Sequence, residues 1–269
     1  MAILLFATAT FAAAQTGTLT VKAGTRVPYT ISSTMDMTES VQGNDVAINR
    51  MIESQTSLTA RKIARNKIDW VFDVSHMHMR MTNPIAGKPV DSSLKVKPML
   101  FSTDQAGRLL AVTSLDPALK QAMHSPGQGN SMEQMFSPAL RRTIKVGDSW
   151  EETRQDTSEV QEGVGGTMVV HVTTRYTYEG DVDTLNTKAS RVRYETTSLS
   201  IDGSLEAQGA KMTIDGDGTG GGLTYYSLND GLMLNSTANM QTSVRISMTS
   251  PQELIIPVTQ KLSTTTVRK

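Results

Sequence analysis

The run at residues 76–81 contains the residue types of a copper site. It reads His-Met-His-Met-Arg-Met, and thioether and imidazole groups suit Cu(I). In a strand, neighbouring side chains point to opposite faces, so His76 and His78 lie on one face and the three methionines on the other. One metal ion cannot easily use both sets. Methionine also fills irregular cores, and the chain has 16 of them. We therefore favour core packing over copper binding for this run.

A second segment, Gly-Asp-Ser-Trp at residues 147–150, is similar to the Gly-Asp-Ser block of an esterase superfamily. That block normally precedes a catalytic Asp and His, whereas only His171 follows Ser149, within an alternating pattern typical of a strand. An Asp-x-x-His segment at residues 73–76 comes before the serine instead of after it. A nucleophilic serine needs a base and an orienting acid. We reject a triad here and interpret the segment as a turn that enters a strand.

Residues 215–220, Asp-Gly-Asp-Gly-Thr-Gly, are similar to the start of a calcium loop. An EF-hand requires flanking helices and a glutamate at its last loop position, which Tyr226 occupies. The segment fits a strand better, with its glycines in phase with Met212 and Ile214. Glycines on an apolar face leave space for a nearby helix or ligand. We expect no metal and no cofactor, and a calcium site of another kind is the less favoured alternative.

The composition excludes several other classes of function. The chain has 269 residues with 26 Lys+Arg and 26 Asp+Glu, so it has no net charge to attract nucleic acid. The absence of cysteine excludes disulfides, a thiol nucleophile and thiolate metal sites. Carboxylates such as Asp202, Asp215 and Asp217 fall at apparent turns and glycine-rich segments, where they are usually solvated. We predict that the protein is not an enzyme.

The first residues indicate export. Residues 1–14 are uncharged and apolar or small, and they end in three alanines before Gln15, as in a signal peptide with its cleavage site. The stretch is too short to span a membrane, and no other apolar run is long enough for a transmembrane segment. The usual basic residues are missing, so we expect the true start to lie upstream. The mature chain is expected to be soluble and periplasmic or extracellular.

Alternating polar and apolar residues predict long strands over most of the chain. Two changes of phase indicate β-bulges, one near Ser75–His76 and one near Thr196–Thr197. Hairpin turns are predicted at residues 43–45, 104–107 and 229–231. Helix signals occur only in the middle, where Asp116-Pro117 can begin a helix and Ser131 with Gln134 can form a capping box.

The predicted fold is mainly β, a β-rich α+β arrangement. Strands this long imply a curved antiparallel sheet or half-barrel, and the short helices of the middle segment are expected to cover its concave face. We expect one domain over residues 15–269, with a helical insertion at about 116–143.

Two segments resemble a family of uncharacterised bacterial exported β-rich envelope proteins. They are residues 145–150 (Lys-Val-Gly-Asp-Ser-Trp) and 225–234 (Tyr-Tyr-Ser-Leu-Asn-Asp-Gly-Leu-Met-Leu). The succession of strands, helices and strands over most of 19–269 also resembles the half-barrels of periplasmic lipoprotein carriers and lipid-binding proteins. This resemblance implies an envelope protein without catalytic residues to carry over. The missing cysteine departs from lipid-anchored members.

Together, these features predict a non-enzymatic exported cell-envelope protein that binds or carries an apolar or lipid ligand in a curved sheet. The main alternative is a structural module that binds a protein partner of the envelope and no small ligand. A Met/His copper-binding protein is the less favoured third possibility. The candidate ligand-binding residues are the apolar ones of the expected inner face: Met35, Met37, Met77, Met79, Met81, Met212 and Ile214.

Overall fold

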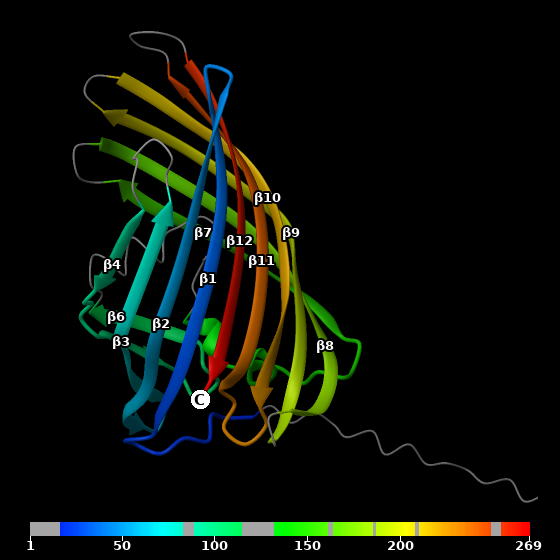
Figure 1. Ribbon diagram of the computed structural model, residues 1–269. Helices are drawn as coiled ribbons and strands as arrows, with labels where there is room; N and C mark the ends of the chain where they lie inside the picture. The colour runs from blue at the N-terminus through cyan, green and yellow to red at the C-terminus, as the bar shows by residue number, and fades with distance from the viewer. Residues whose placement is uncertain are drawn as a thin grey trace, which may run out of the picture.

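The computed structural model describes residues 17–82, 89–114, 132–160, 164–184, 187–207, 210–248 and 254–269. Within these ranges it is one antiparallel sheet of twelve strands (Figure 1). The strands are β1 (Arg26–Val41), β2 (Asn44–Ala64), β3 (Lys67–Thr82), β4 (Val90–Leu94), β5 (Met99–Thr103), β6 (Leu109–Ser114), β7 (Ser149–Val160), β8 (Val164–Thr184), β9 (Thr187–Ala207), β10 (Ala210–Ser227), β11 (Met233–Met248) and β12 (Leu254–Arg268). The prediction of a mainly β fold is confirmed.

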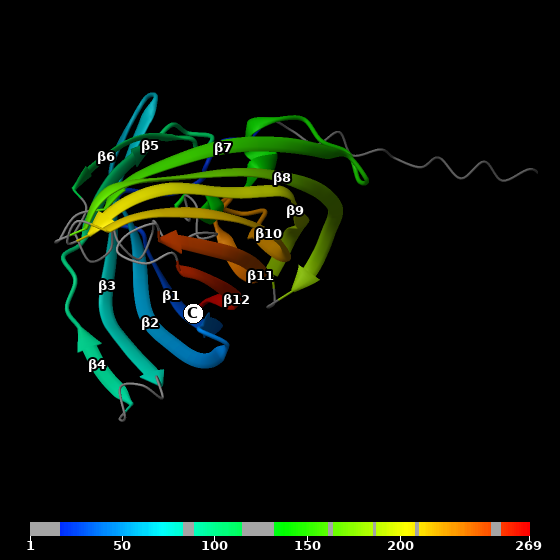
Figure 2. The same cartoon turned by 90° about the horizontal axis from the view of Figure 1, so that it is seen from above.

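The sheet curls into a trough that does not close. Its order is β6-β5-β3-β2-β1-β12-β11-β10-β9-β8-β7, and β4 pairs with the far part of β3. The first and last strands therefore meet in the middle of the sheet, where β1 pairs with β12, and β6 and β7 are its two edges. Viewed from above, the strands surround a concave side (Figure 2). This curvature turns one face of every long strand towards a common interior.

The first predicted bulge is confirmed at Ser75. His76 pairs with Gln55 and Val74 pairs with Thr56, so Ser75 is the extra residue of β3. Its hydroxyl donates a hydrogen bond to the Gln55 carbonyl at 3.1 Å. An extra residue shifts the alternation by one position. The bulge therefore keeps the apolar residues before it and the methionines after it on the same face of the sheet.

The second predicted bulge is confirmed at Thr197. Thr173 pairs with Ser198 and Thr174 pairs with Thr196, which leaves Thr197 as the extra residue of β9. Its hydroxyl donates to the Thr173 carbonyl at 3.3 Å. The two bulges lie in different halves of the sheet, and both add local twist where long strands bend.

The first hairpin turn differs slightly from its prediction. β1 ends at Val41 and β2 begins at Asn44, so the turn is Gln42-Gly43 instead of residues 43–45. Both turn residues have positive φ, 52° and 80°. Two-residue hairpins favour this conformation because its twist matches that of the strands, and glycine adopts it without a steric penalty. The predicted turns at 104–107 and 229–231 do lie between paired strands.

The described part of the middle segment contains two short 3₁₀ helices, η2 (Glu133–Met135) and η3 (Pro138–Arg141). Pro138 is the first residue of η3, where its missing N–H costs nothing, and the Ser137 hydroxyl accepts a hydrogen bond from the Ala139 N–H at 3.3 Å. The predicted helix start at Asp116-Pro117 and the capping serine at position 131 lie outside the described residues, as do residues 1–16 with the predicted signal peptide.

An aromatic cluster joins this segment to the sheet. Phe136 packs against Trp70 of β3 and Phe101 of β5, with ring centroids 5.2 and 6.3 Å away. All three side chains are at most 2% exposed. Gly107 makes the approach possible, because a Cβ there would lie 2.4 Å from that of Phe136. The main hydrophobic core therefore lies at one end of the trough, between the sheet and the 3₁₀ helices.

Glu133 of η2 connects the two edges of the sheet. One of its carboxylate oxygens accepts a hydrogen bond from the Leu109 N–H of β6 at 2.9 Å. The other lies 2.9 Å from the guanidinium of Arg154 on β7 and 3.9 Å from that of Arg141 on η3. One partly buried side chain thus links edges that do not pair through their backbones.

We expect Glu133→Gln to destabilise the protein by about 1–3 kcal/mol, because it removes the carboxylate that Arg154 and Arg141 share in a partly buried place. Arg154 then has only Glu152, 3.8 Å away, as an acidic partner among the described residues, and Arg141 keeps only its hydrogen bonds to backbone carbonyls there. The amide oxygen of the new glutamine can still accept the hydrogen bond from the Leu109 N–H, so the variant measures the effect of the lost negative charge alone. Urea denaturation measures the loss, and hydrogen exchange should rise in β6 and β7. The control is Glu151→Gln, which removes the exposed pair with Arg175 and should cost less than about 1 kcal/mol. Equal losses in both variants would contradict the linking role.

Candidate functional site

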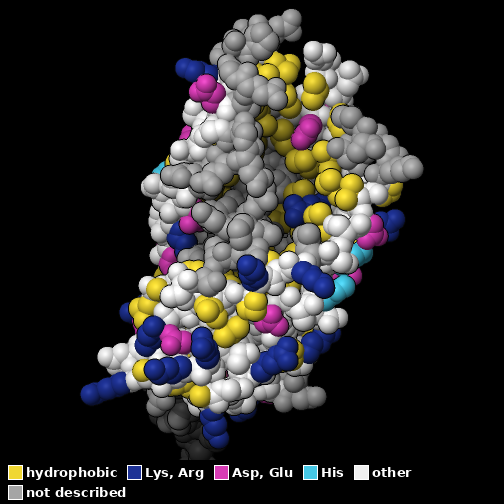
Figure 3. Space-filling view, turned by 90° about the vertical axis from the view of Figure 1, so that its left-hand side faces the viewer, with side chains coloured by type: hydrophobic (Ala, Val, Ile, Leu, Met, Phe, Trp, Pro, Cys, Tyr) yellow, Lys and Arg dark blue, Asp and Glu magenta, His cyan; other side chains and the backbone are white. Residues whose placement is uncertain are grey.

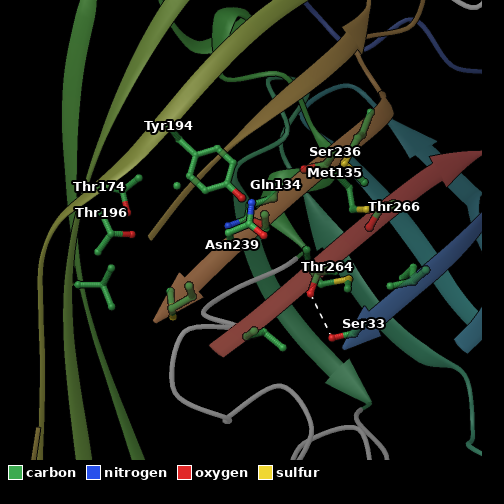
Figure 4. A pocket seen from close by; sticks show the side chains of 18 of the residues that line it. Ser33, Gln134, Met135, Thr174, Tyr194, Thr196, Ser236, Asn239, Thr264 and Thr266 are labelled. Atoms are coloured by element: carbon green, nitrogen blue, oxygen red, sulfur yellow. Dashed lines mark hydrogen bonds between the residues drawn. The ribbon is translucent and has the colours of Figure 1, made fainter. Parts of the chain in front are cut away.

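A cavity of about 260 Å³ lies between the concave face of the sheet and η2. Figure 4 shows Gln134 and Met135 of η2 at one side and Tyr194 of β9 at another. Strands from both halves of the sheet supply its apolar lining, which includes Ile31, Ile52, Met77, Val172, Met240 and Leu262. The cavity exists because a strongly curved sheet with one short covering segment cannot fill its own interior.

Polar side chains, most of them hydroxyls, alternate with this apolar lining. Ser33 of β1 and Thr264 of β12 share a hydrogen bond of 3.2 Å between their hydroxyls (Figure 4). The Thr56 hydroxyl is buried and has no hydrogen-bond partner among the described residues. Apolar walls with polar groups at defined positions are typical of sites for small molecules.

Only Met77 of the seven predicted ligand residues lines the cavity itself. Two others pair with residues that do, since Met79 pairs with Ile52 and Met35 with Leu262. Directly paired residues lie on the same face of a sheet. By the same alternation Met37, Met81, Met212 and Ile214 lie on the concave face beyond the cavity. The predicted face is therefore present, but most of the predicted residues lie along the trough outside the cavity.

The trough beyond the cavity is also apolar. Val170, Leu199 and Ile201 form a second buried cluster on β8 and β9, and partly buried residues pack against it: Met168, Val172, Ile214, Met240 and Val244. Figure 3 shows a hollow in the upper half of one side of the molecule, where hydrophobic side chains gather with acidic and basic atoms among them. The cavity is thus one end of a longer apolar surface.

Gly216, Gly218 and Gly220 of β10 do not leave free space, contrary to the interpretation from the sequence. A Cβ on Gly216 would lie 2.7 Å from the Ser243 carbonyl oxygen, and one on Gly220 would lie 2.8 Å from that of Asn239. The neighbouring strand β11 takes up this space. The missing side chains therefore permit tight curvature between β10 and β11 instead of making room for a ligand.

Charged side chains on β7, which are not among the residues predicted from the sequence, line one wall of the cavity. Glu152, Arg154 and Asp156 alternate with exposed residues and all line the cavity. Arg142 lies 3.2 Å from Glu152, and its guanidinium is 4.7 Å from the centre of the Trp150 ring. The alternation that starts at Trp150 predicts that these three side chains point towards the interior of the trough. Hydrophobic patterning, however, does not predict charged residues at such positions.

The tyrosines of the cavity wall are neutral hydrogen-bonding groups. Burial is the main cause that raises the pKa of Tyr194 and of Tyr176 above the ordinary value. The Tyr194 hydroxyl donates to the Thr237 carbonyl at 3.4 Å. A phenol with a raised pKa does not lose its proton at neutral pH, so these residues contribute surface and hydrogen bonds and no negative charge.

The histidines and methionines of residues 76–81 lie on opposite faces, as the alternation indicates. His78 contacts the Asp91 carboxylate at 2.6 Å, whereas Met77 faces the cavity. Over the part of the chain that the structure describes, no group of three or more His, Cys, Asp or Glu could hold a metal ion. The run therefore has its methionines in the trough and its histidines outside.

The other chemical candidates of the sequence are not brought together. The Ser149 hydroxyl lies 2.8 Å from that of Thr177, and Ser149 pairs with Thr177. His171 pairs with Gln155, which lies six residues beyond Ser149 on β7. His171 is therefore about 20 Å from Ser149 along the strand. Residues 215–220 lie within β10, so the predicted glycine-bearing strand is confirmed.

Comparisons with known proteins found only distant structural similarity. No protein-family profile and no curated protein matches the sequence. An outer membrane channel from Pseudomonas putida F1 is 10% identical, with 93% of this chain and 97% of that chain covered and a TM-score of 0.28. A candidate AttH protein from Nitrosomonas europaea is 9% identical, with 91% and 98% covered and a TM-score of 0.17. A DUF1329 family protein from Desulfovibrio piger is 8% identical, with 86% and 83% covered and a TM-score of 0.14.

At these TM-scores the similarity does not indicate a shared function. Within the described residues, none of the helices has the length and apolar character needed to cross a membrane.

Proposed function

We propose that this protein is an exported, non-enzymatic envelope protein that binds or carries an apolar chain, such as that of a lipid, on the concave face of its sheet. The observation that carries the proposal is the cavity of about 260 Å³ that opens into a longer apolar trough. Small-molecule pockets usually measure about 300–1,000 Å³. The cavity alone is slightly smaller than this range, so a chain-like ligand that continues along the trough fits better than a compact one.

The chemistry of the wall supports binding instead of catalysis. The polar groups that line the cavity are mainly hydroxyls, and one pair of them, Ser33 and Thr264, already bonds to each other. A hydrolase needs a nucleophile activated by a base or a metal-bound water. The serine and histidine that could resemble such a pair, Ser149 and His171, lie far apart along β7 and β8.

A protein partner is the second candidate, and one observation favours it. β6 is an edge strand, and its Leu110 and Val112 are 54% and 43% exposed. An exposed apolar edge can pair with a strand of another protein. This function would need no ligand in the trough, so the two candidates can be separated by experiment.

The test is a titration with a fluorescent probe that carries a long alkyl chain and emits strongly only in apolar surroundings. We expect saturable binding of one probe per chain and displacement by unlabelled lipid. A soluble dye with the same fluorophore and no chain should not bind. Absence of saturable binding would overturn the proposal. Recruitment of an envelope protein through β6 in the same preparation would then favour the partner-binding module.

A further inference from the structure

Arg50 is a charged side chain on the apolar concave face. It pairs with Met35 of β1 on one side and Met81 of β3 on the other. Ile52, the next residue of β2 on the same face, lines the cavity. Arg50 therefore lies at the rim of the cavity, among methionines that line the trough.

Its guanidinium has no partner within the described chain. The Nε atom is buried without a hydrogen bond, and no described acidic group forms an ion pair with Arg50. The inward-facing acid of the neighbouring strand, Glu39, lies four residues beyond Met35, about 13 Å along β1. Burial lowers the pKa of Arg50, as expected for a cation without a compensating charge.

A second unpartnered donor lies near the same rim. The Ser92 hydroxyl of β4 is buried without a hydrogen bond, and Ser92 pairs with Met79, the partner of Ile52. On the opposite wall, Asp156 of β7 lines the cavity with a negative charge. The cation on the β2–β4 side has no acidic partner among the described residues, whereas the arginines near β7 are paired with Glu133 and Glu152, so an anion is attracted to the β2–β4 side of the trough.

We propose that Arg50 binds the anionic headgroup, a carboxylate or a phosphate, of an amphiphile whose alkyl chain occupies the cavity. This inference rests on the proposed function and specifies the class of ligand. Arg50 is half-buried with its Nε atom shielded and without a described acidic partner, so only an anion supplies both a charge-assisted hydrogen bond and the compensating charge. The planar donors of a guanidinium match both headgroups. A neutral chain of the same length gains the apolar contacts alone.

The experiment compares three ligands below their micellar concentrations: dodecanoate, dodecyl phosphate and dodecanol. Each competes with the fluorescent alkyl probe. We expect the wild-type protein to bind at least one of the two anions about tenfold or more tightly than dodecanol. Arg50→Met should remove this preference and leave dodecanol binding unchanged, while Arg50→Lys should retain part of it.

The matched control is Arg80→Met, which removes an exposed arginine of β3 that lies on the other face, and it should keep the preference. Inorganic phosphate and acetate should not displace the probe, since they lack the chain. If they do so at similar concentrations, Arg50 holds a free anion and the headgroup proposal is wrong. Equal affinity for anions and dodecanol would also overturn it, whereas failure of all three ligands to bind would overturn the proposed function itself.

Discussion

Replacement of Trp70 by alanine is expected to lower the free energy of unfolding by about 3–5 kcal/mol, because it removes the largest side chain of the core. Trp70 is 1% exposed and packs between Phe101 and Phe136. Its indole N–H donates to the Thr103 hydroxyl at 2.9 Å, and Thr103 is fully buried. The variant therefore leaves a cavity and a buried hydroxyl without its partner.

Urea denaturation followed by circular dichroism measures this loss. Trp150→Ala is the control, because Trp150 is only half-buried and stacks on Tyr176 at one side of the cavity. It should cost clearly less, about 1–2 kcal/mol. A loss below about 1 kcal/mol for Trp70→Ala would show that the aromatic cluster does not hold the middle segment on the sheet.

Thr264→Phe is expected to weaken binding of the alkyl probe about tenfold or more. Thr264 lines the cavity opposite η2 and bonds to Ser33 across β1 and β12. A phenyl ring there takes up space that the chain would use, and a tenfold loss corresponds to about 1.4 kcal/mol of binding free energy. The fold should persist, since the new ring enters an existing cavity instead of a filled core.

Thr265→Phe is the matched control for this prediction. Thr265 is the next residue of β12, and its exposed side chain lies on the other face of the sheet. The same ring is added to the same strand, so strand propensity and probe quenching are nearly equal. Probe affinity that falls equally in both variants would mean that the chain does not enter the cavity.

Local alternation explains why much of the fold could be predicted. Both bulges follow from a change of phase within one strand, as at Ser75 between Val74 and Met77, and need no knowledge of the partner strand. The same alternation assigns Met35 and Met212 to one face. It does not predict which residues of that face line a cavity, because this depends on the curvature of the sheet and on the position of η2.

Contacts between distant segments account for what the sequence did not predict. Glu133 meets Leu109 and Arg154 only because the sheet brings its two edges together, and nothing near residue 133 indicates this. The role of Gly216 depends on the carbonyl of Ser243 in the next strand. Arg50 has an unremarkable sequence context, and its isolation among methionines becomes visible only in the paired strands.

Native mass spectrometry shows whether the trough holds an amphiphile. The purified protein is incubated with vesicles of envelope lipids, separated from them without detergent and measured intact. We predict a population heavier than the bare chain by the mass of one lipid, which is reduced in Thr264→Phe and unchanged in Thr265→Phe. Bare protein alone in all three samples would mean that the trough does not hold a lipid.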